Sequence, residues 1–182
     1  MKKLIIIFIS FIIISSCSST KELNSSRSVT RSEKKIAEQA IVKRAVEAKK
    51  YIIKLNRLYF NRGGQVDLIP RANYIIIDGE KAIISTAYLG RQFDIKPIAA
   101  INMRGKADAY ALTSNVSKGT YEVKMKVENG RNTSFDVYLN IGKSGYCTVS
   151  VSSLKIESIR YAGYLEPIPG TTYYVPDQTN PI

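Results

Sequence analysis

The sequence contains no histidine, no tryptophan and only two cysteines among its 182 residues. The absence of histidine excludes Ser-His and Cys-His catalysis, imidazole metal sites and the usual general base near neutral pH. The sequence also lacks a G-x-S-x-G elbow, a G-x-x-x-x-G-K-[ST] loop and a dinucleotide-binding glycine pattern. We therefore expect a protein that is not an enzyme and that has no cofactor and no metal centre.

The two cysteines, Cys17 and Cys147, do not form a disulfide framework, because Cys17 has another use described below. Cys147 lies in the segment Gly145–Val151, where alternation places it on the same face as Val149 and Val151. A buried free cysteine behaves as a small apolar side chain. We expect Cys147 to belong to the core, and the alternative is a reactive thiol.

No apolar run is long enough to cross a membrane as a helix. The longest, from Leu4 to Ile14, has about ten residues, whereas a spanning helix needs ~20. Lys2 and Lys3 precede this run and Ile14-Ser15-Ser16-Cys17 follows it, which is the pattern of a bacterial lipoprotein signal. Residues 1–16 are then removed, and acyl chains such as palmitate on Cys17 anchor the protein in the cell envelope, which we expect to be the outer membrane. The alternative is an ordinary secreted protein with a cysteine beside the cleavage site by chance.

Positive charge exceeds negative charge along the whole chain. Without Lys2 and Lys3 the sequence has 25 basic and 15 acidic residues, a net charge of about +10. Behind an export signal this charge indicates anionic lipid, lipopolysaccharide phosphates, acidic glycans or an envelope protein as partners, and not nucleic acid. The alternative is a solvated basic surface that keeps the protein soluble.

The mature chain begins with a polar, serine-rich segment over residues 17–32, which predicts a flexible tether after the lipidated cysteine. Ser32 is a suitable N-cap, and Glu33 follows it in the first turn of a predicted helix. An apolar stripe at helical spacing predicts that this helix packs on a sheet. The stripe comprises Ile36, Ala37, Ala40, Ile41, Ala45 and Ala48.

Period-two alternation then predicts about eight strands in a domain over residues 33–167, before an irregular Pro-rich tail over 168–182. The turn Asp78-Gly79 predicts a hairpin, and a further turn is expected at Arg104-Gly105. The fold class is therefore α+β and mainly antiparallel β, with one N-terminal helix packed on a curved sheet, a sandwich or an open barrel. The segments that supply these strands are Tyr51–Tyr59, Asn73–Ile77, Lys81–Tyr88, Ile98–Met103, Ala107–Thr113, Tyr121–Val127, Phe135–Ile141, Tyr146–Val151 and Leu154–Leu165.

Tyrosine is the abundant aromatic residue, with twelve in the chain. Its ring stacks on sugars and its hydroxyl forms hydrogen bonds, so Tyr88 with Arg91, beside Gly90, is the candidate recognition patch. The alternative is that the tyrosines fill the ends and rims of the sheet. The sequence predicts a non-catalytic binding or assembly module, with a binder of an anionic ligand or glycan as the second reading. A hydrolase with two carboxylates is the third reading.

Several segments resemble a Bacteroidota lipoprotein family catalogued as domain of unknown function 4251. Asn73–Gly79 and Tyr88-Leu89-Gly90-Arg91 are similar to its tyrosine, apolar, turn and aromatic-glycine-arginine pattern. Gly145–Val151 and Ile159–Pro167 are similar to its final glycine-led strand and its isoleucine-x-tyrosine-x-glycine end. The resemblance covers roughly Ser32 to Pro167.

The sequence departs from that family at Thr86-Ala87, where members often have leucine-proline, and near Ala99–Ile101, where it lacks a glycine-glycine-isoleucine segment. The resemblance implies a fold and an envelope location. It implies no activity, because none is established for the family.

Overall fold

The computed structural model describes residues 20–93, 98–130 and 133–170, with side chains from residue 31 onward. The chain forms two compact units, Met1–Ile36 and Ala37–Ile182. All the strands lie in the second unit. The predicted signal segment, Cys17 and most of the predicted tail lie outside the described residues.

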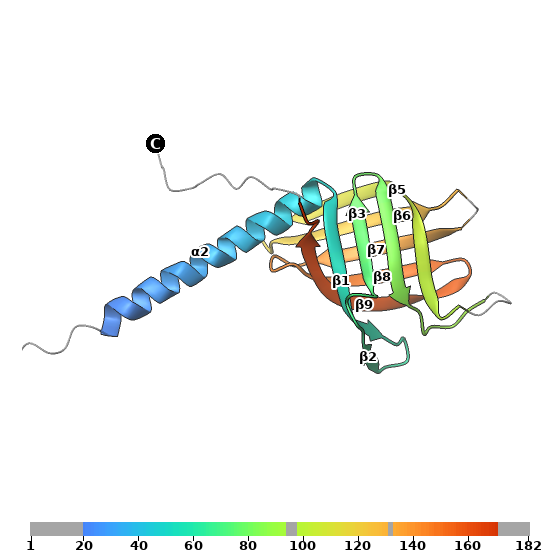
Figure 1. The fold of residues 1–182 in the computed structure, drawn as a ribbon, viewed down its shortest axis with the longest axis horizontal. Helices are drawn as coiled ribbons and strands as arrows, with labels where there is room; N and C mark the ends of the chain where they lie inside the picture. The colour runs from blue at the N-terminus through green and yellow to red at the C-terminus, as the bar shows by residue number, and fades with distance from the viewer. Residues whose placement is uncertain (1–19, 94–97, 131–132, 171–182) are drawn as a thin grey trace, which may run out of the picture. The chain divides into compact units, whose positions relative to one another are not determined.

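In the part of the chain that the structure describes, one long helix precedes nine strands, and Figure 1 labels all of these elements except β4. The elements are α2 (Thr20–Glu47), β1 (Lys50–Tyr59), β2 (Gln65–Asp67), β3 (Tyr74–Asp78), β4 (Lys81–Ala87), β5 (Ala100–Asn115), β6 (Thr120–Glu128), β7 (Ser134–Ile141), β8 (Tyr146–Ser153) and β9 (Ile156–Pro167).

The strands form a single antiparallel sheet in the order β2-β1-β3-β4-β5-β6-β7-β8-β9, which closes through a further pairing of β1 with β9. This pairing runs from Tyr51↔Pro167 to Tyr59↔Arg160, and the two strands lie side by side in Figure 1. The three-residue β2 pairs with the end of β1 and leaves eight strands in the closed barrel. The predicted α+β class with antiparallel strands is confirmed, and the arrangement is a barrel that is closed rather than open.

Alternation along the strands fills the barrel interior with apolar side chains. Val123, Met125 and Val127 of β6 are buried, whereas Lys124 and Lys126 between them are exposed. The same rule places the free Cys147 inside with Val149 and Val151, so the core prediction for this thiol is confirmed. The largest fully buried side chains are Tyr51, Tyr88, Tyr161, Ile53, Leu55, Leu58, Ile75, Ile77, Ile84, Ile101, Leu139 and Ile141.

The last turns of α2 cover one end of the barrel. Val42, Ala45 and Val46 are buried in the same apolar cluster as the barrel interior. The hydroxyl of Tyr110, near the end of β5, donates to the carbonyl oxygen of Val46 at 3.2 Å and lies 3.2 Å from the hydroxyl of Tyr51. Tyr110 thus ties the end of the helix to β5 and, through Tyr51, to β1.

The helix differs from the expectation in two ways. It begins at Thr20, so the predicted start at Ser32 is wrong, and Thr20–Ser32, assigned above to the tether, are helical. This segment contains no glycine or proline, so a helix stabilised farther along can extend through it without an apolar face. The predicted stripe is also partly wrong, because Ile36 is 57% exposed whereas Val42, outside the stripe, is buried.

The predicted turn at Arg104-Gly105 is wrong, because β5 continues through both residues to Asn115. A β-carbon on Gly105 would lie 1.9 Å from the carbonyl oxygen of Glu128. Glycine is required here by the close approach of the chain beside β5 and not by a reversal. The hairpin at Asp78-Gly79 is confirmed, with Asp78 paired to Lys81.

Candidate ligand-binding site at the barrel mouth

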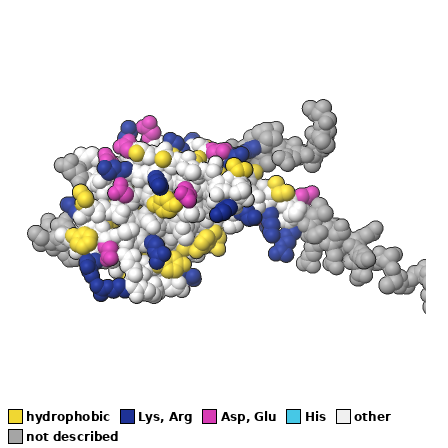
Figure 2. All heavy atoms as spheres, turned by 180° about the vertical axis from the view of Figure 1, so that it is seen from behind, with side chains coloured by type: hydrophobic (Ala, Val, Ile, Leu, Met, Phe, Trp, Pro, Cys, Tyr) yellow, Lys and Arg dark blue, Asp and Glu magenta, His cyan; other side chains and the backbone are white. Residues whose placement is uncertain are grey.

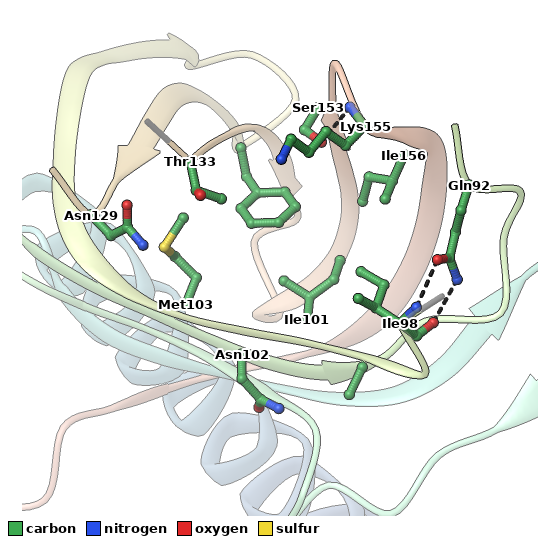
Figure 3. Close-up of a pocket in the computed structure, with 12 residues that line it drawn as sticks. Gln92, Ile98, Ile101, Asn102, Met103, Asn129, Thr133, Ser153, Lys155 and Ile156 are labelled. Atoms are coloured by element: carbon green, nitrogen blue, oxygen red, sulfur yellow. Dashed lines mark hydrogen bonds between the residues drawn. The ribbon is translucent and has the colours of Figure 1, made fainter. Parts of the chain in front are cut away.

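The barrel end opposite the helix, which we call the mouth, contains a cavity of about 340 Å³ (Figure 3). The first residues of β5, the turns that join β6 to β7 and β8 to β9, and the linker from β4 to β5 surround it. The lining residues are Gln92, Ile98, Ala100, Ile101, Asn102, Met103, Asn129, Thr133, Phe135, Ser153, Lys155 and Ile156.

The floor of the cavity is apolar because alternate residues of the strands point inward. Ile101 and Met103 of β5 are 1% and 3% exposed, and Phe135 of β7 and Ile156 of β9 are also buried. Asn102, between the two β5 residues, points away from them in Figure 3 and its Oδ1 accepts from Ser85 Oγ at 3.1 Å. The polar side chain on the outer face of β5 therefore does not point into the cavity.

The side chain of Gln92 joins the two described ends of the linker between β4 and β5. Gln92 donates through Nε2 to the carbonyl of Ile98 at 2.6 Å and accepts from the Ile98 amide at 2.7 Å, as the dashed lines in Figure 3 show. The backbone amide of Phe93 donates to the carbonyl of Lys155 at 2.9 Å, and Gln92 forms a β-bridge with Ile156. These bonds fix one wall of the cavity to the start of β9.

The rim of the cavity is polar and carries positive charge. It contains Asn129, Thr133, Ser153 and Lys155, and Lys155 is the one charged side chain among the lining residues that the structure describes. Its backbone amide donates to Ser153 Oγ at 3.1 Å, and in Figure 3 its side chain extends across the mouth toward Thr133. The arrangement presents an ammonium group above an apolar floor.

Tyr88, predicted as a recognition residue, is 1% exposed. Its hydroxyl donates to the carbonyls of Arg91 and Glu157, and a β-carbon on Gly90 would lie 2.8 Å from the ring carbon that carries the hydroxyl. A buried ring offers no face for stacking, so Tyr88 is not available to a ligand as the sequence suggested. It acts as an anchor between the linker and β9, and its burial raises the pKa of the phenol.

Arg91 is exposed and lines a separate groove of about 530 Å³ outside the barrel, together with Arg62 and Glu157. The pKa of Glu157 is lowered, first by a hydrogen bond from Asn61 and then by the Arg91 backbone amide and the two arginines. One carboxylate thus offsets part of the positive charge in this groove. The structure separates Tyr88 from this surface and places Arg91 on it.

Sequence reasoning missed the residues of the mouth. Phe135 begins one of the predicted strands, but no local pattern shows that this strand ends at an opening. Gln92 and Lys155 come from segments far apart in the chain, and only the closure of the barrel brings them together. One signal in the sequence lies just before the last strand. There the apolar Leu154, which is 98% exposed in the structure, precedes Lys155.

Other chemistry is sparse in the part of the chain that the structure describes. It contains no group of three or more histidine, cysteine or carboxylate side chains placed to hold a metal ion. None of its helices combines the length and the apolar composition needed to span a bilayer. Figure 2 shows Lys and Arg scattered over one face with Asp and Glu among them, so that face carries no single basic patch.

Comparison with known families matches residues 33–165 to the model described as "Domain of unknown function (DUF4251)". The chain belongs to the DUF4251 family. The resemblance found in the sequence is thereby confirmed, and the matched residues contain every strand of the barrel except the last two residues of β9. The mouth cavity lies wholly within the DUF4251 domain.

The chain is similar in fold to a DUF4251 family protein from Bacteroides eggerthii DSM 20697, with a TM-score of 0.61. The two share 12% sequence identity over 72% of this chain and 88% of the other. A comparison with curated proteins finds no match. At this identity the likeness concerns the DUF4251 fold alone, and the function has to be argued from the site.

Proposed function

We propose that this DUF4251 protein is a non-catalytic binding module, held in the cell envelope by lipid on Cys17, that takes a small apolar ligand into the mouth cavity. The observation that carries the proposal is the apolar floor of Ile101, Met103 and Phe135 beneath a polar rim. Small-molecule sites are typically concave and apolar with a few polar groups, at roughly 300 to 1,000 Å³. The mouths of β-barrels are among the places where they occur.

The envelope address rests on the sequence of residues 1–17. A positively charged start, a short apolar run and Ile-Ser-Ser-Cys favour cleavage before Cys17 and its acylation. Two or three acyl chains hold a protein on a membrane, whereas one binds marginally. The outer membrane remains the expected location.

Intact mass of the membrane-extracted protein, beside a Cys17→Ala variant, tests the address. We expect the wild-type chain to begin at Cys17 with added acyl mass, and the variant to lack that mass. An unmodified wild-type chain in the soluble fraction would remove the anchor from the proposal.

Binding at the mouth is tested with the neutral dye N-phenylnaphthylamine, whose fluorescence rises in apolar surroundings. We expect the wild-type protein to bind the dye and Thr133→Phe, which adds a ring at the rim, to bind it much more weakly. Thr148→Phe is the matched control, because Thr148 is exposed on β8 and does not line the cavity. Failure of the wild-type protein to bind, or equal binding by both variants, would overturn the mouth as the site.

A second candidate function is the binding of an anionic ligand or glycan at the outer groove. Arg62 and Arg91 both line it, and guanidinium groups form paired hydrogen bonds with carboxylates and phosphates. Arg91→Gln should then weaken binding to an acidic glycan and leave dye binding at the mouth unchanged. Unchanged glycan binding would remove Arg91 from this role.

A hydrolase is the alternative that we do not propose. Asp108 and Glu128 share one depression on the outside of the barrel, lined also by Arg104 and Lys106. Glu128 forms an ion pair with Lys126 at 3.3 Å. This environment is that of ordinary surface carboxylates, which pair with neighbouring cations.

A further inference from the structure

Two exposed tyrosine rings lie together on the outer face of the barrel. Tyr146 of β8 and Tyr164 of β9 are 39% and 49% exposed. The pairing of β8 with β9 places these residues directly opposite one another. Their rings meet edge to face, with centroids 5.4 Å apart and planes at 71°. We call this pair of rings the tyrosine corner, and it leaves aromatic surface in contact with solvent.

The Tyr146 ring has close neighbours on the far side of β9. Partial burial and then the side chain of Tyr59 raise the pKa of the Tyr146 phenol, whereas the nearby Arg57 lowers it. Arg57 Nε in turn donates to Asp67 Oδ1 at 3.2 Å. Tyr59 and Arg57 belong to β1, and β9 lies between β1 and β8. These neighbours restrict the Tyr146 ring, so less side-chain freedom is lost when a ligand binds to it.

The corner is bordered by charged side chains that are joined in ion pairs. Lys54 pairs in register with Tyr164, and its Nζ lies 2.5 Å from Glu166 Oε2. Arg57 and Asp67 form the second pair, at 3.2 Å. Each pair presents hydrogen-bond donors and acceptors together and adds no net charge. Such groups suit the neighbouring hydroxyls of an uncharged ligand better than they suit an acid or an amine.

A sugar ring has both of the features that this surface complements. The C–H groups of a pyranose form an apolar face that packs on an aromatic ring, and its hydroxyl groups both donate and accept hydrogen bonds at the edge. Tyrosine supplies a large, rigid contact area at a low cost in conformational entropy. Tyr88 is buried and cannot stack on a sugar, whereas the two rings of the tyrosine corner are exposed.

We propose that the tyrosine corner binds a neutral pyranose residue of a glycan, one with equatorial hydroxyl groups. The sugar stacks on Tyr164 and Tyr146, and its hydroxyl groups bond to the ion pair of Lys54 with Glu166. None of these four residues lines the mouth cavity or the outer groove. The glycan site is therefore separate from both and does not depend on the function proposed for the mouth.

Titration of the wild-type protein with cellohexaose tests the assignment, because its β-linked glucose units have equatorial hydroxyls and expose C–H groups on both faces. The tyrosine ring signals, followed by NMR, give the affinity and identify the rings that the sugar contacts. We expect the signals of Tyr146 and Tyr164 to shift. Tyr164→Ala should weaken binding by about tenfold, which corresponds to roughly 1.4 kcal/mol. Tyr164→Phe keeps the ring and should bind within about twofold of the wild-type protein.

Tyr138→Ala is the matched control, because Tyr138 is a partly exposed tyrosine on the outer face of β7. It should leave the affinity unchanged, and unchanged signals from the buried tyrosines show that each variant is folded. Absence of shifts at Tyr146 and Tyr164, or equal weakening by Tyr138→Ala and Tyr164→Ala, would overturn the proposal. A dimer that Tyr164→Ala abolishes, with no binding of the sugar, would also overturn it and assign the tyrosine corner to a second copy of the chain.

Discussion

Closure of the barrel depends on a glycine in the last strand. Gly163 of β9 pairs with both Leu55 of β1 and Cys147 of β8, next to the point where the register of the closing pair shifts. A β-carbon at this position would lie 2.1 Å from the carbonyl oxygen of Lys54 and 2.9 Å from the α-carbon of Leu55. Gly163→Ala therefore forces the backbones of β1 and β9 apart along the seam.

The size of the effect follows from the identity of the colliding atoms. Overfilling a packed interior costs ~1–3 kcal/mol when side chains can adjust. The atoms here belong to the backbone and cannot rotate away, so we expect Gly163→Ala to lower the free energy of unfolding by about 3 kcal/mol. For a domain of this size that loss lowers Tm by roughly 10 °C.

Urea unfolding and thermal melting followed by far-UV circular dichroism measure both quantities. Gly142→Ala is the control, because a β-carbon there would lie 3.5 Å from the carbonyl oxygen of Tyr146, an ordinary contact. We expect the control to remain within about 0.5 kcal/mol of the wild-type protein. A Gly163→Ala protein as stable as Gly142→Ala would refute the argument that this approach of β1 and β9 requires glycine.

Two further predictions concern buried polar groups. Burial raises the pKa of Cys147 from near 9 to about 12, so its contribution to stability is present below about pH 9 and is lost as the pH rises toward 12. The urea midpoint of the wild-type protein should fall more steeply across that window than that of Cys147→Ala, and parallel curves would contradict this. Tyr88→Phe removes the hydroxyl that donates to Arg91 and Glu157 and should lower stability by about 1–2 kcal/mol. Tyr164→Phe, at a half-exposed ring, should change the free energy of unfolding little in the same urea titration. Equal losses in the two variants would show that the buried hydrogen bonds of Tyr88 add no more stability than an exposed tyrosine hydroxyl.

The strands could be predicted because apolar and polar residues alternate within each segment, and this alternation identifies the side chains that face inward. The pattern of Val123, Met125 and Val127 against two lysines is sufficient to orient β6 without knowledge of its neighbours. Glycine is harder to interpret from sequence, because the same residue serves where the chain reverses and where two backbones approach closely. At Gly105 the deciding atom is a carbonyl 23 positions away in the chain, at Glu128, which no local pattern reveals.

The site was predicted less well, for the same physical reason. Tyr88, beside an arginine and a glycine, has the composition of a recognition patch, but its ring is buried by the pairing of the linker with β9. The mouth is formed by Gln92, Phe135 and Lys155, which have no shared sequence pattern. These residues lie close together because the barrel closes, and closure of the barrel depends on the pairing of β1 with β9.

The helix that covers one end of the barrel also determines how the other end can work. With Val42, Ala45 and Val46 buried in the same apolar cluster as the barrel interior, packed side chains separate the mouth cavity from the helix end, so a ligand that enters at the mouth also leaves there.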